Sequence, residues 1–256
     1  MHSGKDPWLV FGADRDEAQA CIVCIAHAGA GAARFHTWTK RLPRSIQIAA
    51  VRAPGRESRR SEPPIDDLFA LAREVGDAVV RAELNAPVAL FGHCSGAIVA
   101  FEVARHLRST GHPAPACLVV SSQSAPHLLP AEDFGGFDLT AVLRELGGTP
   151  EEVLKSPDFL EMIGPAVEAD FRMLAGYRFH SDAPLELPIF AVMASGDTDL
   201  GVNDISGWAR HTDGGFHLLH VTGDHVFSGD GWAGLADAVS EIVCRELNSG
   251  PCRKAL

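Results

Sequence analysis

The sequence predicts an α/β fold, with a mostly parallel β-sheet and helices on both of its faces. Short apolar runs recur along the 256-residue chain and alternate with stretches whose apolar residues have helical spacing. Hydrophobic residues make up 46% of the chain and charged residues 21%, a balance that is typical of a folded core. Several apolar runs end in glycine-rich or polar loops, and α/β proteins bind ligands at such strand ends.

Six apolar runs are predicted strands, and predicted helices lie between them. The strands are Cys21–Ala26, Ile46–Val51, Val88–Phe91, Cys117–Ser122, Pro188–Ala194 and Phe216–Val221. The helices are Ala33–Arg41, Asp66–Leu84, a stretch that begins at Ser95, and Trp232–Leu247. We expect residues 1–256 to form a single domain, because α/β folds of this length commonly do.

The stretch from Pro126 to Pro184 interrupts the alternation. It has helical patterns at Leu139–Leu146, Pro150–Leu154 and Ala166–Tyr177, and no good strand pattern. Inserted between the fourth and fifth strands, at approximately residues 126–184, these helices are expected to form a lid that excludes water and shapes an acyl pocket. The alternative is a second packing layer without a functional role.

A nucleophile is predicted where the third strand meets the next helix. Val88–Phe91 is followed at once by residues 92–96, which have the sequence Gly-His-Cys-Ser-Gly. This is the layout of a nucleophile elbow, a sharp strand-to-helix turn that exposes its middle residue. The flanking glycines are expected because the turn leaves no room for side chains. The middle residue of such turns is usually Ser, and here it is Cys94.

A cysteine nucleophile needs a base that generates the thiolate. In α/β-hydrolase layouts the acid and then the histidine follow the nucleophile along the chain. His225, in a Gly-Asp-His turn after the sixth strand, is the predicted base among 12 histidines. Asp199 is the predicted acid, because it fits the Gly-x-x-Asp-x-x-Val pattern after the fifth strand. Asp197 remains the alternative, although Asp at its position is also common in turns.

Two backbone N–H groups are predicted to stabilise the oxyanion of a tetrahedral intermediate. Ser95 begins the helix after the elbow, so its N–H should face the substrate while its hydroxyl should not. The second donor is expected to be the N–H of Ala28, in the small-residue loop after the first strand.

Composition excludes several other functions. The net charge of −11 argues against nucleic acid as a partner. No apolar run reaches the roughly 18 residues of a membrane span, and the first residues have no apolar signal region, so we expect a cytoplasmic protein. We also expect a monomer. Cys21 and Cys24 have metal-site spacing but lie in an apolar strand without a second ligand pair, so we expect no metal or disulfide there.

Residues 34–60 contain eight basic residues and one acidic residue, Glu57. The segment is either an ordinary solvated surface or a docking patch for an acidic partner or a phosphate.

Short motifs along nearly the whole chain carry a family resemblance. They are Asp6–Leu9 (Asp-Pro-Trp-Leu), His27–Gly31 (His-Ala-Gly-Ala-Gly), Pro54–Glu57 (Pro-Gly-Arg-Glu), Leu143–Pro150 (ending Gly-Gly-Thr-Pro), and Ala169–Phe171 (Ala-Asp-Phe) with Tyr177. Together they resemble the type II thioesterases that accompany polyketide synthases and nonribosomal peptide synthetases. The resemblance implies an α/β-hydrolase fold with a helical lid. It also implies a substrate acyl group tethered to the phosphopantetheine arm of an acyl or peptidyl carrier protein, with no cofactor on the enzyme itself. The chain departs from the family at Cys94-Ser95, where Ser-Met or Ser-Leu is usual, and at Ala30, where Gly is usual.

Three functions are therefore open. The family resemblance favours hydrolytic editing of acyl groups on a carrier protein. The thiol of Cys94 favours acyl transfer or cyclisation, because an acyl group held as a thioester stays activated toward thiols, amines and hydroxyls. A protein that only binds a ligand is the third, and the complete set of nucleophile, base and acid counts against it.

Overall fold

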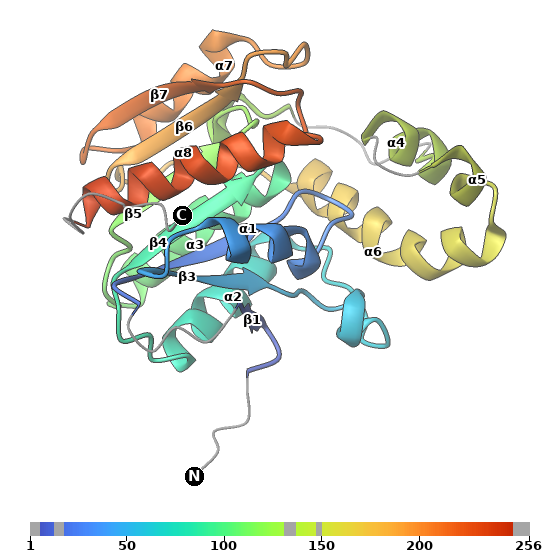
Figure 1. Ribbon diagram of the computed structural model, residues 1–256, viewed down its shortest axis with the longest axis horizontal. Coiled ribbons are helices and arrows are strands. Elements are labelled where there is room, and N and C mark those ends of the chain that lie inside the picture. Colours follow the sequence, from blue (N-terminus) through green and yellow to red (C-terminus); the bar gives the residue numbers. More distant parts are fainter. Residues whose placement is uncertain (1–5, 13–17, 131–136, 147–149, 248–256) are drawn as a thin grey trace.

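The computed structural model describes residues 6–12, 18–130, 137–146 and 150–247. In these residues seven strands form one sheet in the order β1-β3-β2-β4-β5-β6-β7 (Figure 1). The strands are β1 Leu9–Phe11, β2 Ala20–Ile25, β3 Ile46–Val51, β4 Val88–His93, β5 Cys117–Ser121, β6 Ile189–Ala194 and β7 Phe216–Val221. β1 is antiparallel to β3 and the other neighbours are parallel. The predicted α/β fold with a mostly parallel sheet is confirmed.

The six predicted strands all form, with ends within two residues of those expected. β1 is an additional edge strand that the apolar pattern does not predict. It has three residues, too few to establish an alternation, and it forms because Leu9 pairs with Val51 at the free edge of β3.

Helices cover both faces of the sheet (Figure 1). α2 (Leu68–Arg81) and α3 (Ser95–Ser109) pack on one face, and α1 (His36–Arg41) and α8 (Asp230–Glu246) pack on the other. Successive residues of β2 alternate between the two cores, since Cys21 belongs to the first and Cys24 to the second. Both thiols are free and buried, and burial raises the pKa of Cys21 to about 12. Their packing role agrees with the sequence-based expectation.

The insertion between β5 and β6 is helical in its described residues. It comprises α4 (Leu139–Leu146), α5 (Glu151–Leu154) and α6 (Pro157–Gly176), which extend to one side of the sheet (Figure 1). α6 begins earlier than predicted, because the Ser156 side chain caps its first turn and proline is tolerated at the first helical position. The three helices share a small apolar cluster separate from the two main cores. We call α4, α5 and α6 the lid.

A short helix, α7 (Val202–Ser206), follows β6. None of the helices in the described part of the chain is long and apolar enough to cross a membrane.

Candidate active site

Cys94 occupies a strained turn between β4 and α3. Its backbone has φ 49° and ψ −127°, in the region that non-glycine residues rarely adopt, which costs on the order of 1–3 kcal/mol. A Cβ on Gly92 would overlap the carbonyl oxygen of Gly96, and a Cβ on Gly96 would lie 2.5 Å from the carbonyl oxygen of Ala26. The turn is stabilised by a 2.8 Å hydrogen bond from the Cys94 N–H to the Ser121 carbonyl. This geometry is that of the predicted nucleophile elbow.

His225 lies in the loop after β7, and its carboxylate partner is Asp197. Asp197 Oδ2 is 2.9 Å from His225 Nδ1, and the Asp197 side chain is completely buried. Asp197 Oδ1 accepts hydrogen bonds from the backbone N–H groups of Asp199 and Leu200, at 3.0 and 3.3 Å. These bonds hold the carboxylate toward the histidine.

The preference for Asp199 as the partner of His225 is therefore wrong in its geometry. Asp199 is exposed, and its carboxylate contacts Thr198 Oγ1 at 3.4 Å rather than the imidazole. The spacing pattern after β6 does not decide between two carboxylates that are two residues apart. The buried one makes the hydrogen bond because the turn directs it inward.

Cys94 has the largest influence on the pKa of His225. The side-chain hydrogen bond with Cys94 and the neighbouring charge of Asp197 outweigh burial and raise the pKa of His225 to about 9. The two other imidazoles nearby behave differently, since burial lowers the pKa of both His27 and His93. Their rings lie 5.5 Å apart, and the His93 ring lies 6.5 Å from that of His225. His225 is thus the imidazole of this cluster that carries a proton near neutral pH.

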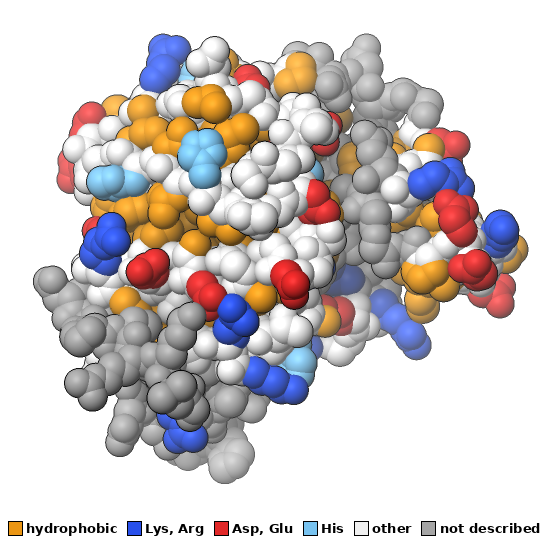
Figure 2. Space-filling model, turned by 45° about the horizontal axis from the view of Figure 1, so that its top comes forward, with side chains coloured by type: hydrophobic (Ala, Val, Ile, Leu, Met, Phe, Trp, Pro, Cys, Tyr) orange, Lys and Arg blue, Asp and Glu red, His pale blue; other side chains and the backbone are white. Residues whose placement is uncertain are grey.

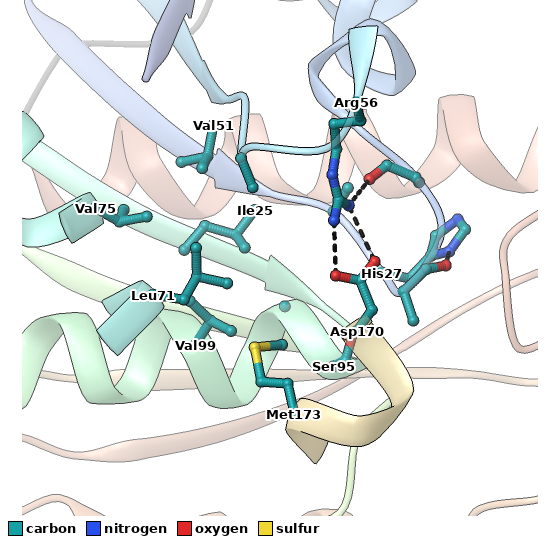
Figure 3. A pocket seen from close by; sticks show the side chains of 15 residues that line it. Ile25, His27, Val51, Arg56, Leu71, Val75, Ser95, Val99, Asp170 and Met173 are labelled. Carbon is teal, nitrogen blue, oxygen red and sulfur yellow. Dashed lines mark hydrogen bonds and ion pairs between the residues drawn. The ribbon is translucent and has the colours of Figure 1, made fainter. Parts of the chain in front are cut away.

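The predicted oxyanion donors line one small cavity. Ala28 and Ser95 both border it, together with apolar side chains of β2, β3, α2 and α3 (Figure 3). Asp170 and Met173 of α6 also line it. The cavity measures about 30 Å³, room for one or two water molecules.

The N–H of Gly29, next to Ala28, donates to Asp170 Oδ2 at 2.8 Å and is not free for an oxyanion. Arg56 also binds Asp170, with Nη2 at 2.7 Å from Oδ1. The sequence patterns assign no role to this pair. Arg56 and Asp170 are 114 positions apart, and their motifs contribute only to the family resemblance.

Three side chains of the site have metal-ligand chemistry. One ligand atom each of Asp197, Asp199 and His225 lie within 4.8 Å of one another. Asp197 and His225 are already joined by a hydrogen bond. A cation bound there would compete with His225 for the Asp197 carboxylate and would remove the bond that orients the imidazole.

The basic segment, residues 34–60, does not form one patch. Arg59 is buried in an ion pair with Glu62, and Arg41 binds Asp237 at the surface. Arg44 precedes β3 and Arg60 follows it, so the two residues lie toward opposite ends of this strand. On the face shown in Figure 2, Lys and Arg side chains are scattered and several adjoin Asp or Glu.

The mostly parallel seven-stranded sheet with helices on both faces matches solved structures of type II thioesterases. Residues 20–244 match the model of the thioesterase domain family, and the chain belongs to that family. It is homologous to the type II thioesterases of nonribosomal peptide and polyketide pathways.

Two curated relatives and one solved structure illustrate the similarity. The gramicidin S biosynthesis protein GrsT of Aneurinibacillus migulanus is 32% identical, covering 88% of this chain and 89% of that protein. Thioesterase PikA5 of Streptomyces venezuelae is 33% identical, covering 86% and 79%. The structure of the type II thioesterase BorB from the borrelidin biosynthetic cluster has a TM-score of 0.82 at 32% identity, covering 96% of this chain and 99% of that one.

Proposed function

We propose that this protein hydrolyses acyl thioesters carried on the phosphopantetheine arm of a carrier protein, through an acyl-enzyme on Cys94. The observation that carries the proposal is the hydrogen bond between His225 and buried Asp197, together with the strained strand-to-helix turn at Cys94, whose side chain raises the pKa of His225. Relatives named for gramicidin S biosynthesis and for a borrelidin biosynthetic cluster support a carrier protein as the partner.

In the first half-reaction the Cys94 thiolate attacks the carbonyl carbon of the thioester. The carbonyl π electrons move to oxygen, and the oxyanion accepts hydrogen bonds from the N–H groups of Ala28 and Ser95. The tetrahedral intermediate then collapses, and the bond to the pantetheine sulfur breaks. The His225 imidazolium gives its proton to the departing thiolate, which leaves as a thiol.

In the second half-reaction neutral His225 takes a proton from water as the water attacks the Cys94 thioester. The second oxyanion uses the same two N–H groups. Its collapse releases a carboxylic acid and restores the Cys94 thiolate beside the His225 imidazolium. Asp197 binds Nδ1 throughout, which keeps Nε2 directed at the reacting atoms.

Acyl transfer is a second candidate, and the thiol of Cys94 is the observation that favours it. A serine enzyme converts a thioester into a more stable oxyester, from which transfer back to a thiol is uphill. With Cys94 the acyl-enzyme is itself a thioester, so exchange with a second carrier thiol is close to thermoneutral. An amine or hydroxyl nucleophile could take the place of water in the same site.

Intact-mass analysis of the protein separates the candidates. A carrier protein loaded with a labelled acyl group is mixed with the enzyme. The mass of the intact enzyme is then followed with time, and an increase by the mass of the acyl group reports the adduct on Cys94. An adduct that water clears within the turnover time supports hydrolysis. An adduct that persists until a second carrier thiol or an amine arrives supports transfer. Absence of both adduct and turnover would leave only ligand binding.

Two variants serve as controls. Cys94→Ala should abolish adduct and turnover while leaving carrier binding intact. Cys94→Ser should form an oxyester. Water can hydrolyse this oxyester, but a second carrier thiol cannot accept its acyl group.

A further inference from the structure

A buried ion pair joins the lid to the loop that follows β3. Asp170 of α6 and Arg56 are bidentate partners, with Nη2 2.7 Å from Oδ1 and Nη1 3.0 Å from Oδ2 (Figure 3). Their side chains are 6% and 15% exposed, so water does not compete effectively for either group. An interaction of this geometry is directional and strong.

Both partners of the pair also bind the backbone of a second loop, the one that follows β2. Asp170 Oδ2 accepts the N–H of Gly29 at 2.8 Å, and Arg56 Nη1 donates to the carbonyl of Ala30 at 2.7 Å. The two bonded loop residues directly follow Ala28. The pair therefore binds the two residues that follow Ala28, whose N–H is proposed to stabilise the oxyanion.

Within the loop, the Ala30 N–H donates to the His27 carbonyl at 3.1 Å, and His27 Nδ1 lies 2.9 Å from the Ala28 carbonyl oxygen. Its residues are small, and Gly29 has φ +78°, a conformation that glycine adopts at no steric cost. A flexible backbone of this kind keeps one conformation only where its polar groups are bound by a rigid neighbour. Here that neighbour is α6, through Asp170.

The lid is attached to the rest of the protein at a second point as well. The Tyr177 hydroxyl, just after α6, donates to Glu102 of α3 at 2.7 Å. Arg105 also donates to Glu102 at 2.7 Å, so this carboxylate keeps a partner when the tyrosine hydroxyl is removed. This second attachment holds the C-terminal end of α6 and involves no residue of the loop after β2.

We propose that Asp170 and Arg56 are positioning residues that make the oxyanion site depend on closure of the lid. With α6 in place, the pair holds Gly29 and Ala30, and the Ala28 N–H points at the reacting carbonyl. When α6 moves outward to admit an acyl chain, Gly29 loses its partner and the donor is no longer aligned. Acyl transfer to Cys94 is then confined to the closed state. This inference rests on the proposed acyl-enzyme function of Cys94.

Two reactions of Cys94 separate this role from a general loss of structure. Acylation by the acetyl thioester of N-acetylcysteamine passes through an oxyanion, whereas alkylation by iodoacetamide does not. Asp170→Asn keeps the size of the side chain but cannot accept the Arg56 fork with both oxygen atoms. We expect acylation to slow by about 10- to 100-fold, less than the full loss of an oxyanion donor, and alkylation to proceed at the wild-type rate or faster.

Arg56→Lys is the second variant, because it keeps the positive charge and removes the fork. We expect the same selective loss of acylation, smaller in size. Tyr177→Phe is the matched control, since it weakens the other attachment of the lid and should leave both rates unchanged.

Equal acylation of wild-type and Asp170→Asn protein would overturn the inference. So would a parallel fall of acylation and alkylation in both the Asp170 and Arg56 variants, or an equal loss of acylation in Tyr177→Phe. Wild-type protein that is alkylated but never acylated would instead refute the proposed function, on which the inference depends.

Discussion

Replacement of Asp197 by Asn tests which carboxylate orients the imidazole of His225. Asp197 Oδ1 accepts the backbone N–H groups of Asp199 and Leu200, and Oδ2 faces His225 Nδ1. In the variant the amide oxygen keeps the two backbone donors, so the NH₂ group faces Nδ1. Two donors cannot share a hydrogen bond, and the imidazole proton moves to Nε2. In that tautomer His225 cannot accept a proton from Cys94 or from water.

The magnitude follows from the loss of the correct tautomer. The same change in a serine protease triad costs about 10⁴-fold in kcat, or about 5.5 kcal/mol. A thiol depends less on its base than a hydroxyl does, so we expect a loss of about 10²- to 10⁴-fold here. Asp199→Asn is the matched control. It removes an exposed charge, whose interactions contribute at most about 1 kcal/mol. Activity should therefore fall by no more than about fivefold.

The assay is release of N-acetylcysteamine from its acyl thioester by wild type and the two variants, with thermal unfolding to establish that each is folded. Nitrogen chemical shifts of His225 report the tautomer directly. A larger loss in Asp199→Asn than in Asp197→Asn would refute the assignment. Retention of the wild-type tautomer in Asp197→Asn would refute the argument from the hydrogen bonds.

Two further predictions concern the pH dependence of the site and the packing of the elbow. In an NMR titration His225 should stay protonated through neutral pH and lose its proton only as the pH rises through about 9. Cys94→Ala should lower the midpoint of this titration, because it removes the largest cause of the raised pKa. An unchanged midpoint would contradict the influence of Cys94 on His225. Gly96→Ala should destabilise the protein by about 3 kcal/mol or more in denaturant unfolding, because the new Cβ would lie 2.5 Å from the carbonyl oxygen of Ile25. Gly176→Ala, at the end of α6, is the control, because its new Cβ would meet no atom within 4 Å. This change should leave the free energy of unfolding the same or raise it by up to about 1 kcal/mol. Equal effects of the two changes would show that the elbow glycine is not sterically required.

The strands and the elbow could be predicted because their signals are local. A buried parallel strand is apolar along most of its length, and β2 to β6 have this pattern. β7 lies at the edge of the sheet with no buried residue, and it was predicted from its Phe, Leu and Val residues alone. The elbow glycines are required by atoms a few positions away, as the overlap between Gly92 and Gly96 shows. β1 escaped prediction because three residues carry no period, and it forms only through pairing with β3.

The sequence by itself therefore determined the fold class, the place of Cys94 and the order of its partners along the chain. Tertiary structure alone decided that Asp197 rather than Asp199 faces His225, since the choice depends on which carboxylate the turn buries. It also brought Asp170 to Arg56 and to the Gly29 N–H. Periodicity and motif spacing describe contacts between neighbours in the chain. A side-chain contact between residues more than 100 positions apart exists only after α6 has packed against the strand ends.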